Sequence, residues 1–203
     1  MLRHLDHVVY VVRHLEAAID DHRRRGFTVT PGGEHVNGVT HNALVPFADG
    51  SYLELIGFRD PQRAATNPWW KVAADGGGFA AFALLSDDLA ADAAALGELV
   101  MSGPQEGGRT RPDGIEVRWR TATLKAPLPF VIEDLTAREL RVPGGASAEH
   151  ANGAMGIASV ALGAVDVSDI EWRYAALRER GAPHVELRKA DKDGIVDVRF
   201  RSS

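Results

Sequence analysis

Two apolar segments of the sequence each carry one side chain that could ligate a metal or transfer a proton. His7 interrupts residues 5–12, and Glu54 interrupts residues 52–56. Both segments alternate in the manner of β-strands that face a core. A buried imidazole or carboxylate destabilises a fold unless it finds a partner. We therefore expect His7 and Glu54 to share one site inside a cupped sheet, with a divalent metal as the expected occupant.

The composition is typical of a globular protein and excludes several functional classes. Of the 203 residues, 45% are apolar and 25% are charged, and the net charge is −5. Because no long run of one sign occurs, we expect no nucleic-acid partner. The absence of cysteine excludes disulfides, thiolate nucleophiles and cysteine-ligated zinc. The apolar run near the amino terminus, residues 8–12, is too short for a membrane span, so a cytoplasmic protein without a membrane partner is the expectation.

The elements needed to position His7 and Glu54 form a β-α-β-β-β unit over residues 1–60. The helix of this unit carries an apolar stripe that begins at Leu15, and Gly26 closes it. Alternation and turn residues predict strands at 5–12, 27–30, 40–47 and 51–58.

The same order begins again in a second unit, residues 79–134. We expect a strand at 79–85 and then a helix capped by Ser86 and ended by Gly103-Pro104. Further strands are expected near 115–124 and 130–134.

A partial third unit, βαββ, occupies residues 155–203 after a linker loop at 135–154. Its strands are expected at 157–165, 184–189 and 194–200, and a capping box that starts at Ser168 opens its helix. The repetition predicts an α+β fold in which two paired βαβββ modules form a cupped, mostly antiparallel sheet. The third unit is expected to pack on the same domain.

With these motifs in place, the sequence resembles the glyoxalase-like domain proteins of the vicinal oxygen chelate (glyoxalase/bleomycin resistance/dioxygenase) superfamily. The resemblance covers nearly the whole chain. Five segments carry it: residues 5–12, 38–44, 52–56, 128–133 and 150–154.

The resemblance implies a divalent metal held by the first and fourth strands of each module, with substrate oxygens completing its shell. Carried over residue by residue, the ligands are His7, Glu54 and Glu133. With a metal bound, Glu133 or Glu54 could act as general base, and Glu133 is the catalytic candidate. The remaining first-strand position falls near Ala81, which cannot ligate. A slip of one residue would exchange Glu133 for Asp134. Zinc, iron(II), manganese and nickel all suit such ligands, and many members of the superfamily bind ligands with no metal.

Each candidate residue also has an ordinary structural interpretation. His7 could be a core histidine with a satisfied ring, and Glu54 a plain strand carboxylate. His41, Trp119 and His150 are candidates for substrate binding. Alternatively, His41 could cap a strand, Trp119 could belong to the core and His150 could stabilise a turn. Four arginines could attract an anionic substrate, although most arginines in such segments are solvated: Arg109, Arg111, Arg138 and Arg141.

Three hypotheses about function follow. The first is a metal-dependent enzyme, of isomerase, lyase or dioxygenase type, that acts on a small oxygen-containing molecule. The second is a metal-free protein that binds or sequesters a small molecule, as resistance proteins do. The third assigns the partial third unit to subunit assembly, for example in a homodimer, with a vestigial cavity. The nucleophile elbow, the phosphate loop and the His-Glu-x-x-His motif are all absent.

Overall fold

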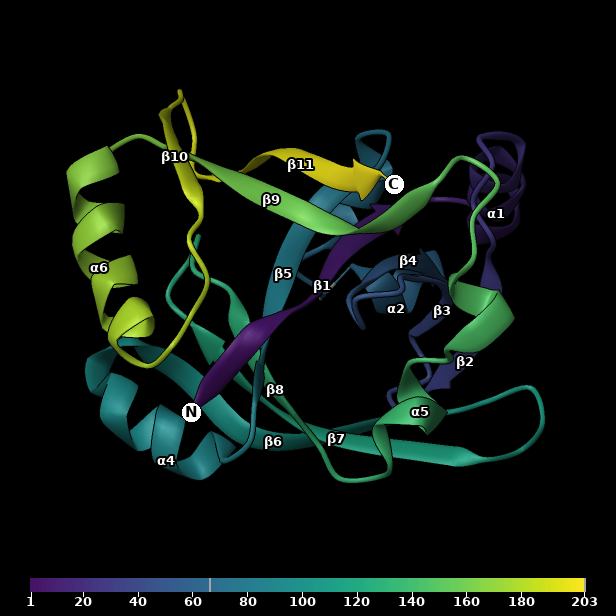
Figure 1. Cartoon of the computed structure of the whole chain (residues 1–203), viewed down its shortest axis with the longest axis horizontal. Coiled ribbons are helices and arrows are strands. Elements are labelled where there is room, and N and C mark those ends of the chain that lie inside the picture. Colours follow the sequence, from purple (N-terminus) through teal and green to yellow (C-terminus); the bar gives the residue numbers. More distant parts are fainter. Residues whose placement is uncertain (66, 203) are drawn as a thin grey trace.

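The computed structural model describes residues 1–65 and 67–202, and within them eight strands form a closed barrel (Figure 1). Around the barrel the order is β1-β4-β3-β2-β6-β7-β8-β5. The first module supplies β1 (Leu2–Val12), β2 (Thr30–His35), β3 (Thr40–Pro46) and β4 (Tyr52–Phe58). The second supplies β5 (Gly78–Ser86), β6 (Val100–Thr110), β7 (Glu116–Leu124) and β8 (Phe130–Asp134).

The pairing within the barrel is mostly antiparallel, as predicted. Only β1–β4 and β5–β8 are parallel among the described strand pairs of the barrel, and each of these pairs lies within one module. The modules meet where β1 pairs with β5 and where β2 pairs with β6. These pairings confirm the predicted fold class of two joined βαβββ modules, with the added feature that the cupped sheet closes on itself.

Helix α1 (Leu15–Arg24) covers the outer face of the first module. It buries Leu15, Ile19 and His22 against the sheet. Gly57 on β4 allows this close packing, because a Cβ at that position would lie 2.7 Å from the Cβ of Leu15. The outer face therefore holds the helix, and the inner face is left for the cavity.

The second module departs from prediction at its helix. Helix α4 (Leu89–Leu96) ends early, at Gly97, whose φ of +51° lies in the left-handed region. A 3₁₀ turn (Gly97–Leu99) follows, and β6 begins at Val100, where a continued helix was expected. The cap is Asp88, which accepts a hydrogen bond from the Ala91 amide, and not Ser86. Pairing of β6 with β7 outweighs the local helical pattern.

Strand β2 also differs from prediction, since it occupies residues 30–35 and not 27–30. Gly32 and Gly33 within β2 are of a residue type that is common in turns. In the structure they lie in a strand with an irregular register, and Gly33 has a φ of +140°. A Cβ on Gly33 would lie 2.0 Å from the carbonyl oxygen of Thr110, so glycine permits the approach of the second module.

The third unit forms a separate sheet in the order β10-β9-β11. It comprises β9 (Ala154–Ala164), α6 (Val167–Glu179), β10 (Glu186–Lys189) and β11 (Gly194–Ser202). The cap of α6 is Asp166 and not Ser168, because the Asp166 carboxylate accepts from two backbone amides. Arg180 joins the unit to the barrel through the buried carboxylate of Asp92, at 2.5 Å. Ser203 lies outside the described residues.

The segments between units are structured. Two short helices, α2 (Pro61–Ala64) and α3 (Trp70–Ala74), connect the two modules. The predicted linker, residues 135–154, contains α5 (Arg138–Arg141) and a 3₁₀ turn (Gly145–Ala148). Over residues 1–65 and 67–202, the helices all lack the length and apolar character that crossing a membrane requires.

Candidate functional site

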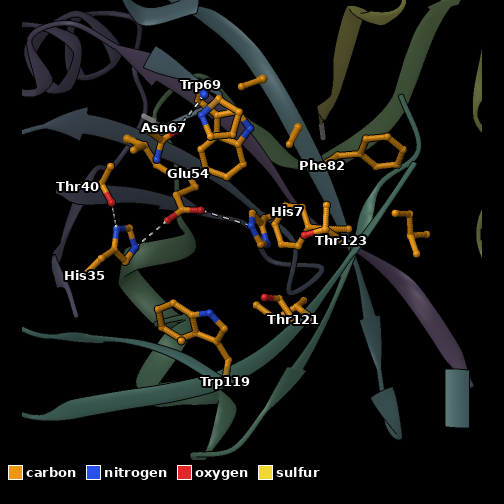
Figure 2. Close-up of a pocket in the computed structure, with 18 of the residues that line it drawn as sticks. His7, His35, Thr40, Glu54, Asn67, Trp69, Phe82, Trp119, Thr121 and Thr123 are labelled. Atoms are coloured by element: carbon orange, nitrogen blue, oxygen red, sulfur yellow. Dashed lines mark hydrogen bonds and ion pairs between the residues drawn. The ribbon is translucent and has the colours of Figure 1, made fainter. Parts of the chain in front are cut away.

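A cavity of about 650 Å³ lies inside the barrel (Figure 2). Its walls are mostly apolar, and Trp69, Phe82, Trp119 and Phe130 are among the lining residues. The third unit contributes residues 193–195 to the lining. Cavities of this size, with mostly apolar walls and a few polar groups, are typical of sites for small organic molecules.

His7 and Glu54 meet in this cavity, as the strand alternation led us to expect. The distance between His7 Nε2 on β1 and Glu54 Oε2 on β4 is 3.3 Å. Both side chains are buried. Figure 2 shows the Glu54 carboxylate between two imidazoles, those of His7 and His35.

The other oxygen of Glu54 has partners from β2 and β3. Asn42 donates a hydrogen bond from Nδ2 to Oε1 at 2.6 Å, and His35 Nε2 lies 3.6 Å from the same oxygen. The Thr40 hydroxyl contacts His35 Nδ1 at 2.7 Å and orients that ring. Burial would raise the pKa of Glu54, but the hydrogen bonds from His35 and His7 outweigh it. The pKa of Glu54 is therefore held well below its ordinary value, and the group is a carboxylate.

The opposite ring nitrogen of His7 is held by Asp6. The distance from His7 Nδ1 to Asp6 Oδ2 is 2.6 Å, and the His7 ring stacks on Tyr52 with centroids 4.5 Å apart. Burial would lower the pKa of His7, but the hydrogen bonds to Asp6 and Glu54 outweigh it and raise the pKa. A protonated His7 between two carboxylates follows from this arrangement.

Asp6 is in turn held by the α5 segment. Arg141 donates to both Asp6 oxygens, at 2.8 and 3.0 Å, and Arg138 Nη1 lies 2.7 Å from Oδ1. Arg141, only 1% exposed, also donates to the Tyr52 hydroxyl at 2.7 Å and pairs with Asp134. Burial would raise the pKa of Asp6, but the charge of Arg141 and the His7 hydrogen bond lower it well below its ordinary value.

The structure does not bring Glu133 to this site. Glu133 pairs with Arg120 at 2.6 Å, and its backbone neighbour Ile132 lines the cavity. Successive residues of a strand face opposite sides of a sheet, so Glu133 faces away from the cavity. Asp134 turns inward to Arg141, which is the one-residue exchange that the sequence left open.

Of the three residues expected to contact substrate, only Trp119 lines the cavity. A Cβ on Gly107 would lie 2.6 Å from Trp119 Nε1, so glycine makes room for the indole. His41 lies on the outer face beneath α1, where its Nε2 approaches Gly57. His150 accepts from the Thr28 amide and donates to the Pro46 carbonyl, and it packs on Phe47. The two histidines serve packing because strand parity and the loop path direct them away from the interior.

Sequence reasoning missed His35 and Asn42 as parts of the site, and it considered Arg141 only as an arginine that could attract an anionic substrate. Strand alternation could have predicted that His35 and Asn42 face the interior, because successive residues of a strand face opposite sides of the sheet. For His35 this prediction required the correct bounds of β2. The role of Arg141 had no local signal, because its partner Asp6 lies 135 positions away.

The donor set does not fit a resident divalent metal. Within residues 1–65 and 67–202, no three His, Cys, Asp or Glu side chains are grouped to hold an ion. In the first module His7 and His35 lie against different oxygens of Glu54, so these three side chains do not converge on one ion, and the second module presents Ala81 at the cavity. Catalytic zinc sites hold one ion with three protein ligands, and the described side chains do not supply such a set.

Comparison with known proteins gives the family. The glyoxalase-like domain family matches residues 5–178, and the chain therefore belongs to this family, within the vicinal oxygen chelate superfamily. None of the curated proteins matches the sequence.

Solved structures share the fold. A hypothetical protein from Staphylococcus aureus aligns with a TM-score of 0.74 and 15% identity, over 95% of this chain and 88% of the other. The Streptomyces coelicolor methylmalonyl-CoA epimerase, in complex with 2-nitronate-propionyl-CoA, aligns with a TM-score of 0.50 and 20% identity, over 67% of this chain and 100% of the epimerase. At such identities the likeness concerns the fold alone.

Proposed function

We propose that the barrel cavity takes up a small organic molecule and holds it beside Glu54 without a resident divalent metal. One observation carries this proposal: an ionised carboxylate, already fixed by His7, His35 and Asn42, lies in a mostly apolar cavity of about 650 Å³. The family supports a role as an enzyme or as a small-molecule binding protein.

The chemistry of Glu54 determines what it can recognise. A carboxylate only accepts hydrogen bonds, and its two oxygens offer about four acceptor positions. Asn42 occupies one of them with a hydrogen bond, and the His7 and His35 rings lie 3.3 and 3.6 Å from the two oxygens. A ligand with an O–H or N–H group could use an acceptor position that remains while its apolar body packs on Trp119 and Phe82.

A second candidate function is acid–base catalysis without a metal. The continuous contacts from Asp6 through His7 to Glu54 favour it, since such chains hold a proton at a defined atom. A pKa near neutrality suits a general base best, and the low pKa of Glu54 argues for binding as the primary function. Deuterium incorporation from D₂O into methylmalonyl-CoA, the compound named for the structurally similar epimerases, tests this candidate. Incorporation that Glu54→Gln abolishes would establish catalysis.

Elemental analysis tests the absence of a metal from the proposed function. Protein purified without chelators should hold zinc, iron, manganese and nickel far below stoichiometric amounts, before and after incubation with each ion. Near-stoichiometric metal that is lost in both His7→Ala and Glu54→Ala would overturn the proposal and favour the metal-dependent enzyme.

A neutral dye tests the cavity itself. N-phenyl-1-naphthylamine has two aromatic units and one N–H donor, and its fluorescence rises in apolar surroundings. We expect saturable binding to the wild type. Thr121→Phe, on the cavity face of β7, should weaken binding about tenfold, because the added ring fills the cavity. Arg118→Phe, at an exposed position of the same strand, is the matched control. Equal binding by both variants would place the dye elsewhere and contradict the proposal.

A further inference from the structure

Arg109 is a buried cation that none of the contacts above explains. It lies on β6, lines the cavity and is 3% exposed. In the strand register of β2 and β6, where the two modules meet, Arg109 lies opposite His35. Its Nη2 donates to the backbone carbonyl of Arg141 at 2.7 Å. Its Nε is buried and has no hydrogen-bond partner.

The other buried charges near the cavity all have partners of opposite sign. Asp6 pairs with Arg141, and Glu54 pairs with His7. Arg109, in contrast, forms no ion pair within residues 1–65 and 67–202. Burying a charge without a counter-charge is costly, so the isolated position of Arg109 requires an explanation.

The guanidinium cannot relieve this cost by losing its proton. Burial lowers the pKa of Arg109, and the charge of Glu54, which forms no ion pair with it, only partly opposes this effect; an arginine side chain nevertheless remains charged in proteins at neutral pH. The remaining way to compensate the charge is an anion in the cavity. A planar guanidinium with a free N–H is well suited to a carboxylate or another oxyanion.

We infer that Arg109 binds the anionic group of the cavity ligand, which makes the ligand class an organic acid with an apolar body. This inference rests on the proposed function and narrows it. An O–H or N–H group on the same molecule would reach Glu54, so the two charged residues would read opposite ends of one compound. The aromatic wall around Trp119 would contact the part between them.

A matched pair of dyes tests the inference. 5-Anilinonaphthalene-1-sulfonate has the ring system of N-phenyl-1-naphthylamine with one anionic group added on the other ring, away from the N–H. The wild type should bind the sulfonate at least about tenfold more tightly than the neutral dye, since a charge-assisted hydrogen bond is gained. Arg109→Met should remove this preference and leave the neutral dye unaffected. Arg24→Met, at an exposed arginine on α1 that pairs with Asp21, controls for general loss of positive charge.

The outcomes separate the two proposals. If the neutral dye binds the wild type and the sulfonate gains nothing, the inference is overturned and the proposed function stands. If neither dye binds, the proposed function fails as well. If Arg109→Met lowers stability but still prefers the sulfonate, Arg109 has only a structural role through the Arg141 carbonyl, and the inference is overturned. Should Arg109→Met fail to fold, Arg109→Lys replaces it. Because lysine keeps the positive charge, this variant should still bind the sulfonate more tightly than the neutral dye, and loss of the wild-type preference would overturn the inference.

Discussion

The two modules of the barrel share one backbone plan but differ in the chemistry of their inner faces. The first places His7, His35, Asn42 and Glu54 on the interior. At the third residue of its fourth strand, the first module has Glu54 on β4 and the second module has Ile132 on β8. The second module also contributes Trp119, Phe82 and Phe130 to the cavity wall.

This difference shows why a duplicated fold need not carry a duplicated site. Buried polar groups are stable only when every member of their network is satisfied. In the first module Asp6, His7 and Glu54 partner one another, and Arg141 from the segment that follows the barrel supports Asp6, although Asn42 Oδ1 has no hydrogen-bond partner. In the second module alanine and aromatic residues need no partners, so they provide volume and an apolar surface. Arg109 is the charged exception there.

The largest expected effect breaks the network that supports the first module. Arg141→Met removes the main partner of Asp6 and should lower the free energy of unfolding by about 3–5 kcal/mol, because a buried carboxylate loses its counter-charge. Arg118→Met, which removes an exposed pair with Glu106, should cost at most about 1 kcal/mol. Denaturant unfolding measures both. Similar losses in the two variants would mean that the buried network contributes no more than a surface pair.

A smaller effect is expected at the aromatic wall of the second module. Gly107→Ala places a Cβ against Trp119 and should cost about 1–3 kcal/mol through overpacking, with a change in tryptophan fluorescence. Gly144→Ala meets no atom within 4 Å and is the control. An unchanged stability and emission spectrum in Gly107→Ala would show that the indole has room to move.

Variants of Glu54 and Glu133 test whether the first module, and not the second, supplies the carboxylate that contacts the ligand. Glu54→Gln should weaken binding of N-phenyl-1-naphthylamine about tenfold, because the dye N–H loses an ionised acceptor. Glu133→Gln breaks only the pair with Arg120, which faces away from the cavity, and should leave affinity within about twofold. Fluorescence titration gives both values. A stronger effect at Glu133 would reverse the assignment of the site to the first module.

The smallest effect is a pH dependence from His7. Its folded-state pKa is raised, so its stabilisation is complete below about pH 6.5, the ordinary histidine value. It is lost as pH rises through the folded-state pKa, by at most about 1.4 kcal/mol per pH unit. The stability difference between wild type and His7→Gln should therefore shrink as the pH rises above about 6.5. A difference that stays constant above this pH would show that His7 is already neutral in the folded protein. His14→Gln, at an exposed histidine, is the control.

Much of the architecture was predictable because strand periodicity is a local property. Alternation located β1, β3 and β4, and the repeated helix-then-strand order indicated two modules and a third unit. Strand β6 was missed because its Gly103-Pro104 indicates a break, whereas pairing with β7 holds it extended. The cap residues Asp88 and Asp166 were missed because serines nearby satisfied the same local pattern.

The site was predictable only in part. His7 and Glu54 stood out as polar residues within apolar strands. Glu133 was assigned to the wrong face because strand parity depends on a register that the sequence did not settle. His41 and His150 looked equivalent to site residues, since nothing in the sequence distinguishes a histidine beneath a helix from one inside a barrel.

The sequence by itself determined the repeated modules, the absence of thiol chemistry and the pairing of one imidazole with one carboxylate. These follow from residue type and short-range periodicity, which act over a few residues. Only the tertiary structure decided that Glu133 of the second module faces away from the cavity, that Arg141 supports Asp6 from 135 positions away, and that Arg109 is buried without an ion-pair partner among the described residues. Those features depend on which long-range neighbours barrel closure brings together, and burial then sets the charge state of each group.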